Sequence, residues 1–123
     1  MTEIAQEEKR LKALWTKRKT VTPFSAFQLW LSSQDKKCFY CGITEELIQK
    51  LLDRNLLTTK RLATRGRKLE LDRKQSELSY DNLDNLVLSC YWCNNAKTDT
   101  FSHEEFLEVG KAFSKIWQQR LTT

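Results

Sequence analysis

Four cysteines are the residues of this sequence whose spacing most directly predicts chemistry. They form two Cys-x-x-Cys pairs, Cys38 with Cys41 and Cys90 with Cys93. Two intervening residues let both thiolates of a pair reach one ion at a bond length of about 2.3 Å, so the two pairs supply a closed tetrahedral zinc site. Gly42 directly follows the first pair and can provide the positive φ that such a turn often needs.

Three other uses of the cysteines compete with zinc. Disulfides are disfavoured because residues 1–10 mix acids and bases and contain no apolar run typical of an export signal. A redox Cys-x-x-Cys motif would explain one pair but not both. A rubredoxin-like iron site fits the ligands, but an electron carrier does not need a basic surface. We therefore interpret the cysteines as ligands of structural Zn²⁺.

The charge of the chain indicates an anionic partner. The 123 residues carry a formal net charge of +5. One basic cluster lies between the two cysteine pairs, and Gly66 inside it indicates a loop whose arginines can reach phosphates. Its members are Lys60, Arg61, Arg65, Arg67 and Lys68, and a second group, Lys9, Arg10, Lys12, Lys17, Arg18 and Lys19, lies near the N-terminus. An ordinary solvated surface would show the same charges, so they support nucleic acid only weakly.

The elements that position these residues are mostly helical. Apolar spacing predicts helices over residues 3–19 and 25–33, and Thr44 caps a third. A short helix is expected over about residues 93–97. Ser102 and Glu105 form a capping box that opens the last helix. Its predicted inner face consists of Phe106, Val109, Phe113, Ile116 and Trp117.

Two short strands are predicted between the cysteine pairs. Residues 69–73 alternate apolar and charged side chains, which is typical of a strand, and residues 86–88 form a short apolar run leading into Cys90. Residues 80–85 are rich in Asp and Asn and indicate a loop. The chain is thus expected to be one α+β domain, mainly helical.

These motifs together resemble the HNH endonuclease family with zinc knuckles. The likeness rests on Cys-x-Tyr-Cys-Gly from Cys38, a strand ending in Asp72, and Asn-Leu-Val-Leu-x-Cys-x-x-Cys-Asn-x-x-Lys from Asn85 to Lys97. It covers about half of the chain and implies a ββα-metal, treble-clef-like zinc core. We expect a helical extension over residues 1–34, the zinc core over 35–101 and a C-terminal helix over 102–123.

The resemblance also implies a catalytic divalent ion. Asp72 and Asn94 match the positions that hold it, and Asn85 matches an asparagine that ties down the loop between the strands. One carboxylate and one amide oxygen favour Mg²⁺ or Mn²⁺, which can stabilise the charge that builds up during phosphodiester cleavage. Lys97 lies nearly one helical turn beyond Asn94 and is expected to hold a phosphate.

Arg73 departs from the family pattern, because members usually have histidine at this position as the general base. Arginine stays protonated and cannot accept the proton. Three alternatives stay open: Glu70 or Tyr80 accepts the proton, solvent or substrate accepts it while Arg73 contacts the phosphate, or the site is inactive. The only histidine, His103, lies inside the capping box and is expected to be a surface residue.

We therefore predict a metal-dependent endonuclease that hydrolyses phosphodiester bonds, with DNA as the expected substrate. Asp72, Arg73, Asn94 and Glu70 are the candidate catalytic residues, and the cluster from Lys60 to Lys68 is expected to grip the backbone with Lys97. The alternative is an inactive zinc-knuckle module that binds nucleic acid or protein. Such a small chain could act as the nuclease subunit of a larger assembly or as a homo-oligomer. A cytoplasmic location without membrane contact is expected.

Overall fold

The computed structural model describes residues 2–58 and 65–122, and in this part of the chain five α-helices surround one two-stranded sheet. This confirms the expected α+β class with mainly helical content. In chain order the elements are α1 (Glu3–Lys17), α2 (Phe24–Ser32), α3 (Glu45–Asp53), β1 (Glu70–Arg73), the 3₁₀ turn η1 (Leu83–Asn85), β2 (Leu86–Ser89), α4 (Tyr91–Lys97) and α5 (His103–Leu121).

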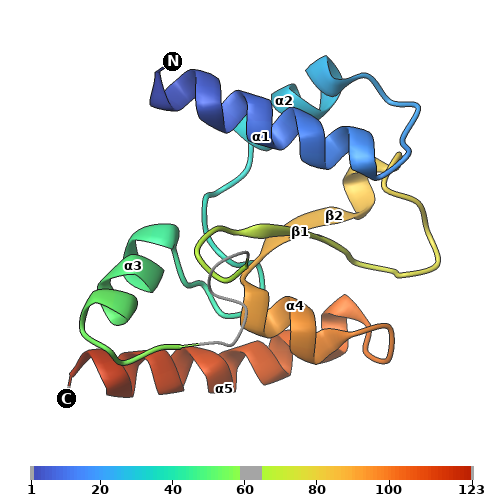
Figure 1. Cartoon of the computed structure of the whole chain (residues 1–123). Coiled ribbons are helices and arrows are strands. Elements are labelled where there is room, and N and C mark those ends of the chain that lie inside the picture. Colours follow the sequence, from blue (N-terminus) through green and yellow to red (C-terminus); the bar gives the residue numbers. More distant parts are fainter. Residues whose placement is uncertain (1, 59–64, 123) are drawn as a thin grey trace.

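The antiparallel strands β1 and β2 form the centre of the molecule. Their register pairs Glu70 with Ser89 and Asp72 with Val87. Since side chains alternate along a strand, Glu70 and Asp72 share one face of the sheet while Leu71 and Arg73 share the other. Figure 1 shows the hairpin between two groups of helices, α1 with α2 above it and α4 with α5 below it.

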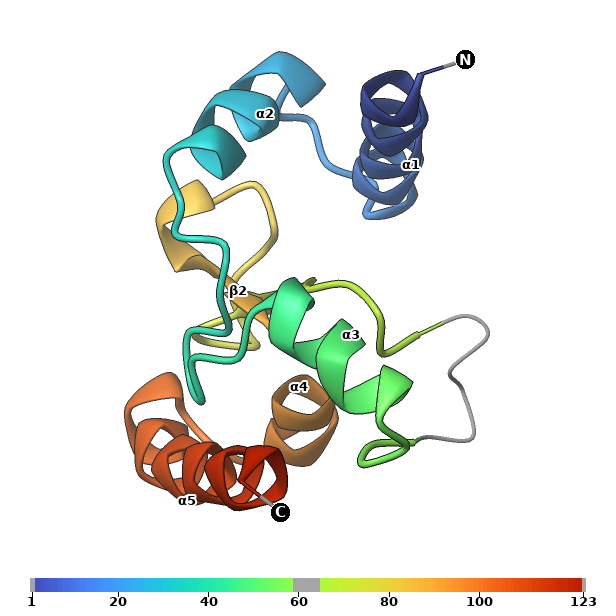
Figure 2. The same cartoon turned by 90° about the vertical axis from the view of Figure 1, so that its left-hand side faces the viewer.

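The larger apolar core lies on the side of the sheet that faces α4 and α5, and Figure 2 shows α3 closing this side next to α4. Ile48 and Leu51 of α3 are fully buried there, together with Phe106 and Trp117 of α5. All four cysteines belong to the same core. The predicted metal cluster is therefore enclosed by the elements that precede and follow it in the sequence.

A second, smaller core attaches α1 and α2 to the opposite face of the sheet. Trp15 of α1 stacks on Phe27 of α2 with ring centroids 4.4 Å apart, and both pack with Leu86. The Trp15 indole N–H donates a hydrogen bond to the Thr22 carbonyl oxygen at 2.8 Å. Asp81 Oδ1, in the loop between the strands, accepts bonds from the backbone N–H groups of Val21 and Thr22. The turn after α1 is thus fixed to the hairpin.

Two predictions about helices α4 and α5 differ from the structure. Helix α4 begins at Tyr91 rather than near residue 93, because the Cys90 sulfur caps it by accepting a bond from the Cys93 N–H. On α5, Val109 and Ile116 are 37% and 41% exposed, although they were predicted to face inward. Gly110 is buried in their place.

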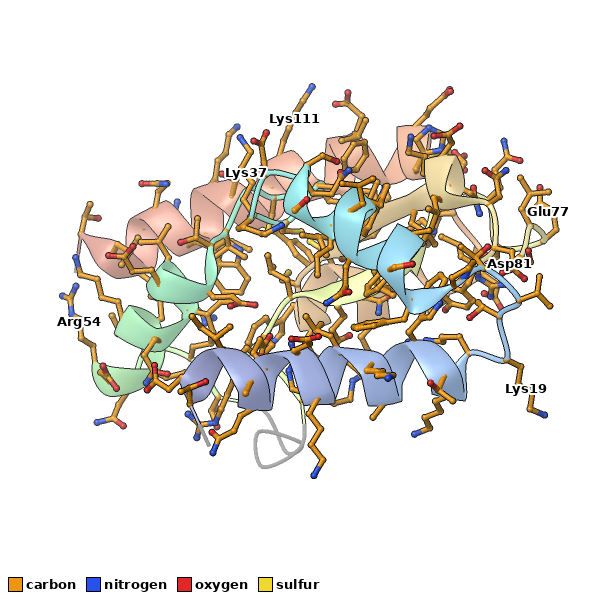
Figure 3. The ribbon with its side chains drawn as sticks, turned by 90° about the horizontal axis from the view of Figure 1, so that it is seen from above. Lys19, Lys37, Arg54, Glu77, Asp81 and Lys111 are labelled. Carbon is orange, nitrogen blue, oxygen red and sulfur yellow. The ribbon has the colours of Figure 1, made fainter. Side chains whose placement is uncertain are left out.

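The outer surface is strongly charged. In Figure 3, Lys19, Glu77 and Lys111 point outward from different parts of the chain. No helix in the described part of the chain is long and apolar enough to cross a membrane.

Candidate functional site

The four cysteine sulfurs gather in one buried cluster. Their Sγ atoms all lie within 4.8 Å of one another, and those of Cys41 and Cys90 are 3.7 Å apart. Four sulfurs at about 2.3 Å from one tetrahedral ion would be separated by roughly 3.8 Å, so this donor set fits zinc. All four thiols are free of disulfide bonds. The predicted cysteine cluster is confirmed as a candidate structural metal site.

Local backbone geometry builds both halves of this cluster. Gly42 has a φ of +77° and donates its N–H to the Cys38 carbonyl oxygen, which closes the first turn as predicted. The second pair lies at the N-terminus of α4, where backbone N–H groups point toward the sulfurs. The Trp117 indole N–H from α5 donates to Cys41 Sγ at 3.3 Å. These donors stabilise negative charge on sulfur.

The close contact of the four sulfurs shifts the pKa values of the thiols in opposite directions. Hydrogen bonds from Cys41, Cys90 and Cys93 lower the pKa of Cys38 strongly. Hydrogen bonding with Cys38 and Cys41 raises the pKa of Cys90 and Cys93 instead. Four adjacent buried thiolates repel one another, so their full deprotonation is unfavourable without a cation. A divalent ion removes this conflict, because zinc binds the deprotonated thiolates.

Asp72 lies in a second polar cluster between β1 and α4. Its carboxylate is largely buried, and Oδ2 accepts a hydrogen bond from the Tyr40 hydroxyl at 2.5 Å. The Lys97 ammonium lies 3.4 Å from the same oxygen. Burial, followed by the hydrogen bond to Asp72, raises the pKa of Tyr40, so its hydroxyl is a proton donor here.

Tyr40 is the member of this cluster that the sequence did not indicate. It lies between the cysteines of the first pair, where it was treated as a spacer. Its ring packs edge-on against Phe106 of α5, with centroids 5.2 Å apart. Only its position between Cys38 and Cys41 could have indicated that it belongs to this cluster, because the turn that these cysteines form lies beside the hairpin in this fold.

Lys97 does not occupy the position expected of a phosphate contact. Its side chain has no exposed surface, and the ammonium donates a hydrogen bond to the Arg73 carbonyl oxygen at 3.0 Å. Together with Asp72 it forms a buried ion pair. The expected phosphate contact does not fit this placement, because a phosphate cannot reach a fully enclosed ammonium.

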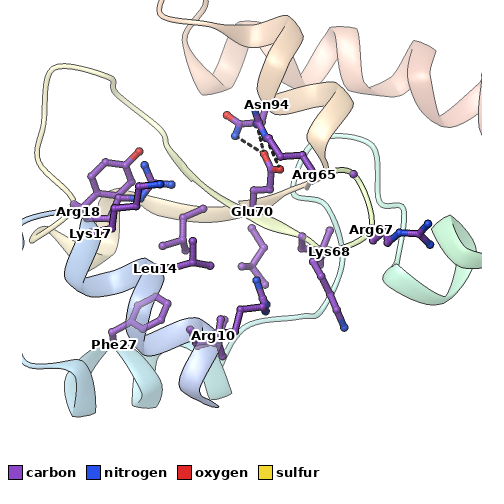
Figure 4. A pocket seen from close by; sticks show the side chains of 17 residues that line it. Arg10, Leu14, Lys17, Arg18, Phe27, Arg65, Arg67, Lys68, Glu70 and Asn94 are labelled. Carbon is purple, nitrogen blue, oxygen red and sulfur yellow. Dashed lines mark hydrogen bonds and ion pairs between the residues drawn. The ribbon is translucent and has the colours of Figure 1, made fainter. Parts of the chain in front are cut away.

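Glu70 and Asn94 face each other across the same junction of β1 and α4. Glu70 Oε1 accepts a hydrogen bond from Asn94 Nδ2 at 3.0 Å, and both Glu70 oxygens accept bonds from the Arg65 guanidinium, at 2.6 and 3.0 Å. Figure 4 shows these three side chains meeting at one end of a cleft. Glu70 with Asn94, and Asp72 with Lys97, thus link the two elements in register.

The face of the hairpin opposite Asp72 carries Arg73. Its guanidinium lies over the Tyr80 ring at 4.9 Å from the centroid and donates to the Leu78 carbonyl oxygen. The Arg18 guanidinium also lies over the Tyr80 ring, 4.6 Å from the centroid. Tyr80, one of the candidate bases, is therefore covered by cations.

Asn85 joins the two ends of the loop between the strands. Its side chain accepts a hydrogen bond from the Gln75 N–H and donates one to the Gln75 carbonyl oxygen, at 3.0 and 3.1 Å. The asparagine is buried, so these bonds satisfy both of its polar atoms internally.

The basic cluster is described only in part. Lys60 and Arg61 lie outside the described residues. Arg65 is bound to Glu70, whereas Arg67 and Lys68 line the cleft beside the junction. Lys68 lies 3.8 Å from Glu45, in a solvent-accessible ion pair of small energetic weight.

Comparison with known proteins gives one informative likeness. No protein-family model and no curated protein matches the chain. Among solved structures it is similar to the rare-cutting HNH restriction endonuclease PacI, with a TM-score of 0.69 and 28% sequence identity. The match covers 98% of this chain and 82% of that chain.

This likeness supports a function of the nuclease kind and extends well beyond the motifs that predicted it. It agrees with the four-cysteine cluster and with the helices around one hairpin. The resemblance inferred from the sequence is therefore shown: over nearly its whole length the chain is similar to an HNH restriction endonuclease, and its four cysteines form a cluster that fits a zinc site.

Proposed function

We propose that this protein is a metal-dependent endonuclease that hydrolyses phosphodiester bonds in DNA. The observation that carries the proposal is the junction of β1 and α4, where Asp72 and Asn94 lie on facing elements beside the cysteine cluster. The structural likeness to an HNH restriction endonuclease supports the same reaction class. The positive net charge supports an anionic substrate.

The donors at this junction fit Mg²⁺ or Mn²⁺. Asp72 uses Oδ2 for Tyr40 and Lys97, and Asn94 uses its amide nitrogen for Glu70. The second Asp72 oxygen and the Asn94 carbonyl oxygen accept no hydrogen bond from any residue in 2–58 or 65–122. These two oxygens would hold the ion, and hard divalent cations prefer such ligands. When bound, the ion supplies positive charge that stabilises the phosphate oxygens during cleavage.

The protein's own residues then have distinct proposed roles. Tyr40 and Lys97 fix one Asp72 oxygen, which would leave the other available to hold the ion. Glu70 is engaged with Arg65 and Asn94, which favours an orienting role over that of a proton acceptor. Arg73 stays protonated and is proposed to contact the phosphate. The proton that the attacking water loses would then pass to solvent or to the substrate.

The alternative is a zinc module that binds nucleic acid without cutting it. It is favoured by one observation: Arg73 replaces the usual histidine and rests on Tyr80, on the sheet face away from Asp72. Such a module would keep the cysteine cluster and the basic surface. It would have no requirement for the Asp72 carboxylate in any reaction.

Nicking of supercoiled plasmid separates the two functions. The zinc-loaded protein should nick the plasmid with Mg²⁺ or Mn²⁺ and should not nick it when these ions are omitted. Omitting the ions is preferable to adding a chelator, because a chelator would also remove zinc from the cysteines. Asp72→Ala should abolish nicking while DNA binding and zinc content persist. Asp99→Ala removes an exposed aspartate just beyond α4 and should cleave normally. DNA binding by the wild type without any nicking would favour the module.

A partner subunit or a second copy is also proposed. Ile4, Val21 and Leu29 are 82%, 88% and 74% exposed, and burial of such apolar side chains against another chain would be favourable. Light scattering of the purified protein should give a mass above the 14.6 kDa of one chain if copies associate. A mass of one chain would leave only a different protein as the partner.

A further inference from the structure

A cleft of about 750 Å³ separates α1 from the segment that leads into β1. Figure 4 shows its two sides, with Arg10, Lys17 and Arg18 on the α1 side and Arg67 and Lys68 opposite them. Arg65 also lines the cleft, whereas Glu70 is its single acidic lining residue among those described. The cleft thus brings together basic residues that are far apart in the sequence.

Helical periodicity explains why only some cations of α1 reach the cleft. Arg10, Leu14 and Lys17 are spaced by four and three residues, so they lie along one face of the helix, and Arg18 follows on the same side. Lys9 and Lys12 are exposed and do not line the cleft. The N-terminal helix therefore presents one basic face inward and another outward.

The inward face is held in place by the fold. Trp15 anchors α1 through its stacking on Phe27, and Asp81 fixes the turn that follows the helix. Arg18 is additionally positioned over the Tyr80 ring at 4.6 Å from the centroid. These cations are therefore presented by a fixed wall, which reduces the entropy that they lose on binding a ligand.

The charge in the cleft is compensated only in part: Arg10, Arg65 and Lys68 pair with Glu7, Glu70 and Glu45. Lys17 and Arg67 form no ion pair with any residue in the described part of the chain. Glu70, the acid in the lining, is already neutralised by the bidentate Arg65 guanidinium. Several fixed cations around one concave surface raise the local concentration of a polyanion.

The cleft is also continuous with the proposed ion site, because Glu70 and Asn94 form one of its ends. A backbone that follows the cleft would therefore pass directly by Asn94. We propose that α1 is the second wall of the DNA-binding groove, with Lys17 and Arg18 contacting phosphates on one side and Arg67 on the other. This inference rests on the proposed nuclease function, since it assigns DNA as the polyanion.

Matched charge removals on the two faces of α1 test this assignment. Affinity for a short DNA duplex is measured by fluorescence anisotropy over a range of salt concentrations, with no added Mg²⁺ or Mn²⁺. A plot of log affinity against log salt concentration has a negative slope, whose magnitude is about 0.9 for each phosphate that the protein neutralises. Lys17→Gln with Arg18→Gln should reduce this slope by about 1.8. Lys9→Gln with Lys12→Gln removes the same charge from the same helix and should leave the slope unchanged.

Arg67→Gln provides an independent readout from the opposite wall, where a reduction of about 0.9 is expected. Zinc content and circular dichroism verify that each variant is folded. Equal reductions of the slope in the two double variants would mean that only the overall charge of the protein matters, and would contradict the groove proposal. An unchanged slope in Lys17→Gln with Arg18→Gln, or no binding by the wild type, would overturn it as well.

The outcome is distinguishable from failure of the nuclease proposal. Binding is measured without the catalytic ion, whereas nicking is measured with it. If only the substitutions on the cleft face of α1 reduce the slope and no nicking occurs, the groove proposal stands and the nuclease proposal is wrong. If the wild type nicks DNA but the substitutions on neither side of the cleft change the salt slope, the nuclease proposal stands and the groove proposal is wrong.

Discussion

Lys97 and Asp72 form a charge pair with almost no access to water. The Lys97 side chain is fully buried and that of Asp72 is 10% exposed. Removing one partner of such a pair leaves an uncompensated charge in a medium of low polarity, which is far more costly than losing an ion pair at the surface. At this scale the lysine is part of the scaffold of the site.

We therefore expect Lys97→Met, which roughly preserves volume, to lower the free energy of unfolding by about 3 kcal/mol. Lys111 offers a matched control, because it is paired with Glu108 at 3.0 Å but is 69% exposed. Lys111→Met should change stability by less than about 0.5 kcal/mol. Urea unfolding of the zinc-loaded proteins measures both values, and equal losses would contradict the buried-pair interpretation.

Glu70 is predicted to act on the proposed divalent ion through Asn94. Its carboxylate holds the Asn94 amide nitrogen, which leaves the amide oxygen for the ion, and Arg65 fixes the carboxylate in turn. Groups that orient a ligand typically contribute 10–100-fold to metal affinity. Glu70→Ala should weaken Mn²⁺ binding by about this factor, as measured by electron paramagnetic resonance of free Mn²⁺.

The control for this prediction is Glu77→Ala, which removes an exposed acid from the loop between the strands. It should leave Mn²⁺ affinity unchanged. Zinc content should be the same in both variants, because neither residue contacts a cysteine. Normal Mn²⁺ affinity in Glu70→Ala would show that Asn94 is oriented without it.

At the scale of elements, α5 packs unusually close to the first cysteine turn. A Cβ atom built on Gly110 would lie 2.2 Å from the Tyr40 carbonyl oxygen and 2.5 Å from its carbonyl carbon. These are backbone atoms of the turn that holds Cys38 and Cys41, so they cannot move freely. Gly110 is therefore required for the approach of the helix rather than for backbone flexibility.

Gly110→Ala should be destabilising even though alanine favours helix by about 1 kcal/mol relative to glycine. Overpacking of this kind costs about 1–3 kcal/mol or more, so we expect a net loss. Thermal unfolding measures it, and the exposed substitution Lys115→Ala on the same helix should have little effect. A melting temperature equal to or above that of the wild type would contradict the close contact.

At the scale of the whole molecule, the cysteine cluster connects the two ends of the zinc core. It joins the turn before α3 to the start of α4, and its sulfurs are part of the main apolar core. Structural zinc contributes about 10–16 kcal/mol in small zinc-binding peptides, comparable to the entire stability of a typical domain. The folded state is therefore expected to depend on the metal.

Removal of zinc by a chelator should cause cooperative loss of tertiary structure. Near-ultraviolet circular dichroism reports it directly, because the Trp117 indole is hydrogen-bonded to Cys41. Lowering the pH should release zinc as well, since protons compete for the thiolates. Re-addition of Zn²⁺ should restore the signal. A metal-free protein with an unchanged spectrum would show that the apolar core alone is sufficient.

The sequence by itself determined the features that depend on short-range spacing. The two Cys-x-x-Cys turns, the positive φ of Gly42 and the alternation that places Glu70 and Asp72 on one strand face all follow from residues close together in the chain. The capping box at Ser102 is equally local. Most helices therefore begin and end near the predicted residues, and the four cysteines that gather in one cluster were identifiable.

Only the tertiary structure decided which partners meet across long separations. Tyr40 reaches Asp72, Lys97 is enclosed behind Arg73, and Gly110 rather than Val109 faces the first cysteine turn. The pairing of Arg65, a predicted phosphate contact, with Glu70 is likewise a tertiary contact. Such contacts depend on the angles at which helices pack on the hairpin, and periodicity within one segment carries no information about those angles.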